Sequence, residues 1–279
     1  MAAAAQRCAR AVIEYEGTAF AGSQRQPNAR TVQGVLEEAL NRLTGERITV
    51  RLAGRTDAGV HATGQVAAFC LRRRQIGERY GWDELRRRLN AVLPADLAVR
   101  SLRPAARTFD PRRDAHRRVY RYRIRDGGAK RPLERHRTLE IEDRLDVGAM
   151  QAAADRMTGV RDFAALGSHP YSTVRHLAEL RVVRRGDLVE VVVTADAFLR
   201  RMVRSIVAVL LEAGRGRMAT EAVDQLLAGR ARALDGRAAP ARGLTLERVT
   251  YSQLKTDQPG EANGGARRRA SVHPKNEPE

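Results

Sequence analysis

Alternation of apolar and polar residues predicts several strands in the first half of the chain. Residues 48–53 place three apolar side chains on one face, which is the two-residue period of a half-buried strand. These side chains are Ile48, Val50 and Leu52. Further strands are predicted near 10–16 and 65–71.

A longer period predicts helices between these strands. Thr31 can cap a helix that Gly45 ends, and six residues of this segment form one apolar stripe. The stripe consists of Val32, Val35, Leu36, Ala39, Leu40 and Leu43. Further helices are predicted from Asp83 to just before Pro94, over 146–157 and over 197–213.

The second half shows the same mixture of elements. Residues 118–125 alternate strictly, with Tyr120, Tyr122 and Ile124 on one face and arginine at 121, 123 and 125 on the other. This pattern predicts a sheet with one basic face. Gly186 lies in the expected turn of a hairpin that joins 179–184 to 188–194.

Strands and amphipathic helices joined by hairpin-length connections favour an antiparallel α+β fold. Pro104 and Pro111 bracket the expected boundary between two subdomains, 1–108 and 109–251. The tail, 252–279, is low in apolar residues and is predicted to be disordered.

The chain carries a net charge of +18, almost all of it before residue 252. A surplus of this size on a compact body attracts a polyanion, so nucleic acid is the natural partner. Lysine occurs only at positions 130, 255 and 275, and the planar guanidinium of arginine suits phosphates and base edges. A GC-rich genome would produce the same bias toward arginine.

The two cysteines, Cys8 and Cys70, have neither metal-binding nor redox spacing, so reduced thiols in a cytoplasmic, soluble protein are expected. No apolar run approaches the ~18 residues of a membrane span. His61, His116 and His176 lack the spacing of metal ligands, and we expect structural roles for them.

The segment Gly54–His61, with sequence GRTDAGVH, carries the strongest candidate chemistry. It sets Asp57 at the mouth of the 48–53 strand, where a rigid sheet holds a reactive side chain but leaves it accessible. Asp and Gly are also common turn residues, so an ordinary turn is the alternative interpretation.

This segment, followed by Gly64-Gln65-Val66, resembles the signature of the tRNA pseudouridine synthase A family. The resemblance extends over residues 10–251 and includes Tyr120-Arg121-Tyr122, Met202-Val203-Arg204 and Gly243-Leu244-Thr245-Leu246. It implies two similar subdomains whose sheets join side by side, with an active cleft at the junction and no cofactor or metal.

The resemblance also implies roles for individual residues. Asp57 would be the nucleophile, Arg204 its partner and Tyr120 an active-site residue that stacks on the base and accepts the C5 proton. Arg55 would fill the space left by the extruded nucleotide, and Leu244 would help to close the uracil pocket. Alone, Tyr120 is more typical of core packing than of chemistry, Leu244 is equally typical of core packing, and Arg55 is nearly as typical of an arginine that orders its own turn.

Three positions depart from the residues common in that family. Ser23 stands where many members have Trp, Ala208 replaces a helix glycine and Arg161 replaces a His. The resemblance implies conversion of uridine to pseudouridine at positions 38–40 of the tRNA anticodon arm, by a homodimer.

Two other functions remain open at this point. A basic RNA-binding or RNA-remodelling protein without chemistry explains the charge equally well. Phosphoryl transfer through an aspartyl nucleophile is the third, but the chain lacks a Gly-x-x-x-x-Gly-Lys loop and an Asp-x-Asp motif.

Overall fold

The computed structural model describes residues 6–72, 81–229 and 238–252. Its strands are β1 (Gln6–Tyr15), β2 (Arg51–Leu52), β3 (His61–Arg72), β4 (Leu97–Ala105), β5 (Ala115–Asp126), β6 (Leu139–Ile141), β7 (Gly159–Asp162), β8 (Val174–Arg185), β9 (Leu188–Ala195) and β10 (Leu244–Tyr251). The helices are α1 (Val32–Thr44), α2 (Trp82–Val92), α3 (Val147–Met157), α4 (Met202–Gly214) and α5 (Glu221–Leu227). Three short 3-10 turns are η1 (Pro132–Glu134), η2 (Ala164–Leu166) and η3 (Ala241–Gly243).

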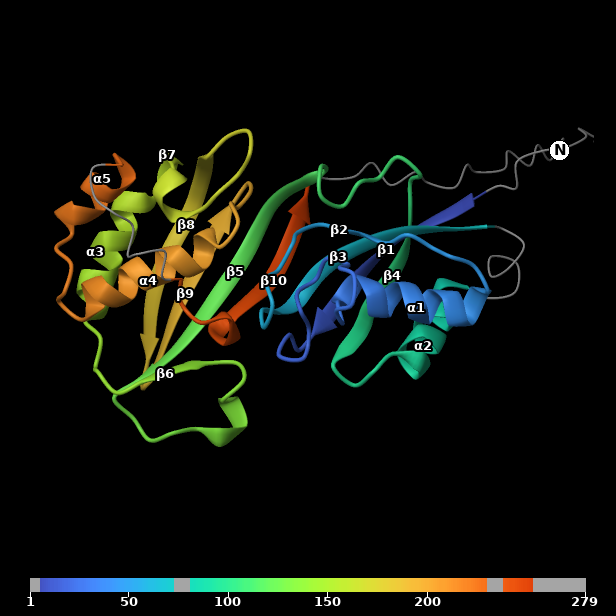
Figure 1. Cartoon of the computed structure of the whole chain (residues 1–279), viewed down its shortest axis with the longest axis horizontal. Coiled ribbons are helices and arrows are strands. Elements are labelled where there is room, and N and C mark those ends of the chain that lie inside the picture. The colour runs from blue at the N-terminus through green and yellow to red at the C-terminus, as the bar shows by residue number, and fades with distance from the viewer. Residues whose placement is uncertain (1–5, 73–80, 230–237, 253–279) are drawn as a thin grey trace, which may run out of the picture.

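All ten of these strands belong to one mixed sheet, in the order β4-β1-β3-β10-β5-β9-β8-β7, with β2 on β3 and β6 on β5. The two halves lie side by side, with α1 and α2 beside the N-terminal strands and α3, α4 and α5 beside the C-terminal strands (Figure 1). The α+β prediction is confirmed. The boundary at residue 108 stays a prediction, because the sheet runs across both halves without a break.

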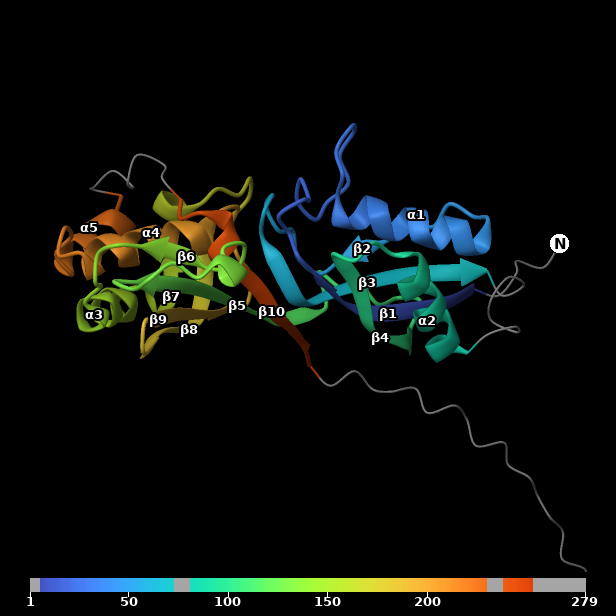
Figure 2. The ribbon, with the colours of Figure 1, turned by 90° about the horizontal axis from the view of Figure 1, so that it is seen from below.

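The last strand connects the halves. β10 pairs with β3 in parallel, through Leu246 opposite Ala62, and with β5 in antiparallel, through Leu246 opposite Tyr120. We call this line of contact the seam. Strands from both halves therefore meet at the seam, where α1 and α4 lie on the same side of the sheet (Figure 2).

The predicted helix at 32–44 and the hairpin around Gly186 are confirmed. Gly45 takes a positive φ of 71° and donates its amide to Asn41, which ends α1. Gly186 also has a positive φ, 65°, in the turn between β8 and β9. Local sequence was sufficient for both because glycine alone adopts this backbone at little cost.

The predicted strand at 48–53 is wrong in extent, since only β2 forms. The Val50 amide donates to the Glu37 carboxylate at 2.9 Å, and the Val50 carbonyl accepts from Gln33 at 3.0 Å. Side chains of α1 thus satisfy backbone groups that a strand would pair, while Ile48 and Val50 remain buried.

The predicted helix at 197–213 begins later than expected, at Met202. The amide of Arg200 donates to Ser168, in a β-bridge with the loop after η2, and Arg201 has a left-handed φ of 63°. Residues 197–201 are therefore not helical, because Arg200 pairs with Ser168 in the loop after η2. Non-glycine residues in this conformation are uncommon and concentrate at functional sites.

The predicted basic face of β5 is neutralised. Arg121 binds Glu247 at 2.6 Å and Glu190 at 2.9 Å, and Arg125 binds Glu134 at 2.8 Å. The alternation along the strand was correct. The prediction of a basic face was wrong, because the acids that pair with these arginines come from distant segments.

The expectation of two reduced thiols is also wrong in the structure. Cys8 and Cys70 form a disulfide. Antiparallel pairing of β1 with β3 sets the two residues directly opposite each other, although 62 positions separate them in sequence.

The core is one connected cluster of apolar side chains that extends through both halves. Leu36 and Leu40 of α1 and Ile206, Val207 and Leu210 of α4 are fully buried. The helical stripes thus supply the surface that packs on the sheet. Over the described ranges, no helix is long and apolar enough to cross a membrane.

Candidate active site

The structure brings Asp57 and Arg204 together across the seam. The Arg204 guanidinium donates to the Asp57 carboxylate at 3.1 Å, although the residues are 147 positions apart. The side chain of Asp57 is 31% exposed and that of Arg204 is 18% exposed. One carboxylate is thus paired with a cation but remains open to solvent on one side.

The loop that carries Asp57 is held at both of its ends. Gln65 on β3 accepts from the Gly54 amide at 3.3 Å and donates to the Gly54 carbonyl at 2.9 Å. The Val60 amide donates to the Asp57 carbonyl at 3.2 Å, and Gly59 adopts a φ of 78°. The side chain of Gln65 therefore replaces a strand partner where β2 has ended.

The residue before the nucleophile candidate is held by two hydroxyl groups. The Thr56 amide donates to the Ser23 hydroxyl at 2.8 Å, and the Thr56 carbonyl accepts from the Ser23 amide at 3.1 Å. The Tyr15 hydroxyl lies 2.8 Å from the Thr56 hydroxyl. Ser23 is fully buried, so these contacts are shielded from water.

Sequence reasoning missed Ser23 and Gln65 as positioning residues. Gln65 lies in the segment Gly64-Gln65-Val66, which resembles the related family, and Ser23 is a position where the chain departs from that family. Neither signal reveals the contact, because the partners lie 33 and 11 positions away.

Ser23→Ala is expected to destabilise the fold by about 1–3 kcal/mol, because it leaves the buried Thr56 amide without an acceptor. Turnover should fall severalfold as the loop carrying Asp57 loosens. Urea unfolding and steady-state kinetics measure both effects. Ser101→Ala, which removes a half-buried hydroxyl on β4, is the matched control, and equal effects of the two substitutions would contradict a positioning role for Ser23.

Arg204 is fixed at its other side by the segment that leads into η3. Its Nε donates to the Ala239 carbonyl at 2.6 Å, and the Ala239 amide donates to the Arg204 carbonyl at 2.9 Å. Arg204 lies in the first turn of α4, directly after the left-handed Arg201. The helix start and the Ala239 segment together aim the guanidinium at Asp57.

Tyr120 lies on β5 beside this pair. Its ring packs edge-on against Phe198, with centroids 5.1 Å apart. Burial raises the pKa of Tyr120 well above its usual value, and the negative charge of Asp57 acts in the same direction. The phenol is therefore protonated at neutral pH and within electrostatic reach of the carboxylate.

Leu244 is buried on β10 directly opposite Tyr122 in the β5 register, two residue pairs away from the Leu246–Tyr120 pair. The Tyr122 hydroxyl donates to the Pro240 carbonyl at 2.8 Å, so this tyrosine anchors the segment before η3. The structure thus brings Leu244 and Tyr120 to the same face of the sheet. Tyr122 lies on the same face, two residues along β5 from Tyr120.

Arg55 is exposed in the loop two residues before Asp57. Among the residues that the structure describes, no carboxylate forms an ion pair with it. Its side chain is therefore available to a ligand that approaches Asp57.

His61 clamps the nucleophile loop to the C-terminal half. Its Nδ1 accepts from the Gly17 amide at 2.9 Å, so its Nε2 donates to the Arg242 carbonyl at 3.0 Å. Burial lowers the pKa of His61, against the opposing effect of Glu16, and this agrees with a neutral ring. This histidine has a structural role, as expected.

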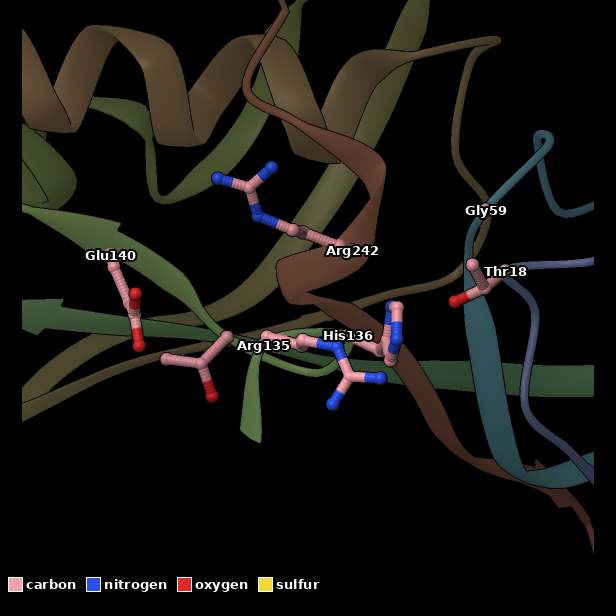
Figure 3. A pocket seen from close by; sticks show the side chains of 7 residues that line it. Thr18, Gly59, Arg135, His136, Glu140 and Arg242 are labelled. Atoms are coloured by element: carbon pink, nitrogen blue, oxygen red, sulfur yellow. The ribbon is translucent and has the colours of Figure 1, made fainter. Parts of the chain in front are cut away.

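A polar cavity of about 480 Å³ lies at the seam, and Arg242, which accepts from His61, is part of its lining. Thr18 and Gly59 line it from the N-terminal half, and Arg135, His136 and Arg242 line it from the C-terminal half (Figure 3). Thr138 and Glu140 complete the lining. The segment 135–140 and Arg242 of η3 thus meet residues of the N-terminal half at one cavity.

No group of three or more potential metal ligands occurs in the part of the chain described here. The chemistry available at the seam is that of a paired carboxylate beside aromatic and aliphatic side chains.

Comparison with known proteins identifies the chain. A family model for tRNA pseudouridine synthase matches residues 11–112 and 153–252. The chain belongs to the tRNA pseudouridine synthase family. Pseudouridine synthases are isomerases, and the matched residues include the loop that carries Asp57, helix α4 with Arg204 and strand β10, whereas β5 with Tyr120 lies between the two matched segments.

Several curated relatives cover most of the chain. It is 46% identical over 250 residues to tRNA pseudouridine synthase A of Chloroflexus aurantiacus, covering 86% of this chain and 87% of that protein. Identity is 43% over 264 residues to the tRNA pseudouridine synthase A of a Roseiflexus species, covering 90% and 94%. It is 41% over 243 residues to the Myxococcus xanthus protein of the same name, covering 86% and 90%.

Proposed function

We propose that this pseudouridine synthase converts uridine to pseudouridine at positions 38–40 in the anticodon stem-loop of tRNA. The pairing of Asp57 with Arg204 across the seam supports the proposal most strongly. Membership of the tRNA pseudouridine synthase family supports the reaction type. The net charge of +18 fits a polyanionic substrate.

The proposed reaction breaks the bond between uracil N1 and ribose C1′, turns the ring and joins C5 to C1′, with loss of the C5 proton and return of one proton to N1. Asp57 is the proposed nucleophile or base. Attack on C1′, attack on C6 and removal of the 2′ proton all require an ionised carboxylate next to the ribose. Arg204 stabilises this charge in a pocket dry enough to retain the detached base.

Tyr120 and Leu244 are proposed to enclose the uracil. Tyr120 is held by Phe198, so its ring offers a fixed surface for stacking. Because its raised pKa keeps the hydroxyl protonated, Tyr120 can accept the C5 proton only after giving up its own. Stacking and hydrogen-bond donation are therefore its primary roles in this proposal.

Arg55 is proposed to enter the RNA stack when the target nucleotide swings out, which costs a few kcal/mol. Its exposure two residues before Asp57 supports this role. The arginines around the seam cavity, Arg135 and Arg242, are proposed to bind phosphates of the same RNA. We further propose a homodimer that acts in the cytoplasm without a cofactor, with each tRNA long enough to touch both subunits.

Release of tritium from tRNA labelled at uridine C5 tests the proposed reaction directly. We expect stoichiometric release without added Mg²⁺, because the C5 proton must leave when C5 bonds to C1′. Tight binding of tRNA without tritium release would overturn the proposal in favour of an RNA-binding protein without chemistry. Sequencing of the treated tRNA for pseudouridine then locates the modified positions.

A further inference from the structure

An exposed aromatic side chain lies on a loop that the proposed reaction does not use. Tyr171, in the connection between β7 and β8, is 91% exposed. An exposed aromatic ring offers a flat surface on which a planar group can stack.

The loop around Tyr171 is ordered by its own contacts. His169 Nδ1 accepts from the Tyr171 amide at 3.3 Å and from the Ser172 amide at 3.4 Å, and the two rings lie edge-on with centroids 5.6 Å apart. The Phe163 amide donates to the Thr173 carbonyl at 3.1 Å, which closes the base of the loop. The tyrosine is therefore presented on a shaped turn rather than on a loose segment.

The same loop is connected to the active site. Ser168 forms a β-bridge with Arg200, and Gly167 lies so close to Leu199 that a side chain would not fit between them. Phe198, the residue before Leu199, packs on Tyr120. In Figure 2 this loop and the connection between β1 and α1 rise on the same side of the sheet, on opposite sides of the seam.

Positive charge surrounds the loop. Arg161 and Arg175 lie directly opposite each other in the β7–β8 pair that carries it, and like charges in this position are destabilising. Arg200, which bridges to Ser168 of the loop, is exposed. Within the described ranges, none of the three forms an ion pair with a carboxylate, so their charges are available to an external anion.

We propose that the β7–β8 loop, residues 167–173, binds single-stranded RNA, with the Tyr171 ring stacked on an unpaired base and Arg161, Arg175 and Arg200 on the neighbouring phosphates. An aromatic platform within a cluster of arginines is the combination that unpaired nucleic acid requires. The inference rests on the proposed RNA substrate and assigns part of it, the bases next to the target uridine.

Stem-loop RNAs that carry 2-aminopurine at one loop position at a time test the stacking, because this base loses fluorescence when it stacks on an aromatic ring. We expect binding to quench one position in particular. Tyr171→Ala should abolish that quenching and raise Kd about five- to a hundredfold. Tyr171→Phe should retain both, since it keeps the ring and loses only the hydroxyl.

Leu133→Ala is the matched control, because Leu133 is 96% exposed on a different loop, in η1, and its removal should change neither readout. Arg161→Ala should weaken binding of all stem-loops by the same factor and reduce the slope of log Kd against log salt concentration by about one. The fluorescence quenching by Tyr171 should remain.

A Kd for Tyr171→Ala within twofold of the unmodified protein, with quenching intact, would overturn the inference. Equal losses for Tyr171→Ala and Tyr171→Phe would show a hydroxyl contact instead of stacking and would overturn it as well. Tritium release by the unmodified protein, measured in parallel, separates this failure from failure of the proposed reaction. Absent release would refute the reaction, whatever the Tyr171 variants bind.

Discussion

Asp57→Asn is expected to reduce tritium release from uridine-labelled tRNA by about 10⁴-fold or more, because an amide can neither attack the ribose or base nor remove a proton. The amide has the same shape and can still accept from Arg204, so the fold should persist. The Kd for tRNA should change less than about threefold, since phosphate contacts supply most of the affinity. Single-turnover assays and filter binding measure the two quantities.

Asp96→Asn is the matched control for this experiment. Asp96 also pairs with an arginine, Arg30, at 2.8 Å, and its side chain is 25% exposed, close to the 31% of Asp57. Loss of this second ion pair should leave turnover nearly unchanged. Substantial turnover by Asp57→Asn would remove Asp57 from the mechanism.

Local pattern was sufficient for much of the fold. The stripe on α1, the alternation on β5 and the glycine at 186 each fix a structure within a few residues, and the structure has all three. Their physical causes act over one or two turns of chain, so they can be read without knowledge of distant partners.

Contacts between distant segments could not be read in this way. The strand at 48–53 is cut short because Gln33 and Glu37 take the hydrogen bonds of Val50. The arginines of β5 are neutralised by Glu190 and Glu247, which no local pattern connects with them. A strand's boundaries and a surface's charge both depend on which segments become neighbours.

The candidate site divides along the same line. Asp57 stood out from sequence because its loop carries a dense motif, and the resemblance to a known family supplied Arg204 as its partner. The contacts that hold the loop, made by Ser23, Gln65 and His61, were not foreseen, because each is an ordinary polar residue until its partner is known.

The seam explains why the site needs both halves of the chain. The nucleophile candidate comes from the N-terminal half, its cation from α4 in the C-terminal half, and β10 joins them. A change that separates the halves would separate Asp57 from Arg204 without altering either residue. The energy of the Asp57–Arg204 interaction across the seam can therefore be measured with variants of the two residues.

Arg204→Ala is expected to lower kcat by about 10²- to 10³-fold, because the guanidinium that steadies the Asp57 carboxylate is lost. KM should change little, since Arg204 is mostly buried and meets the acid rather than the RNA backbone. The free energy of unfolding should fall by about 1–3 kcal/mol, because the Ala239 carbonyl also loses its donor. The kcat of Arg204→Lys should lie between those of Arg204→Ala and the unmodified protein. A lysine ammonium keeps the charge but cannot bind Asp57 and the Ala239 carbonyl together, as the guanidinium does.

A double-mutant cycle measures the pairing of Asp57 with Arg204, and activity per folded molecule separates a catalytic role from a merely structural one. Unfolding of Asp57→Ala, Arg204→Ala and the double variant should give a coupling energy of about 0.5–3 kcal/mol, since the two side chains are in direct contact. A structural role alone predicts that activity per folded molecule stays constant in Arg204→Ala. A fall in kcat that persists after correction for the folded fraction assigns Arg204 to the reaction, whereas full activity of the folded fraction would assign it to the fold.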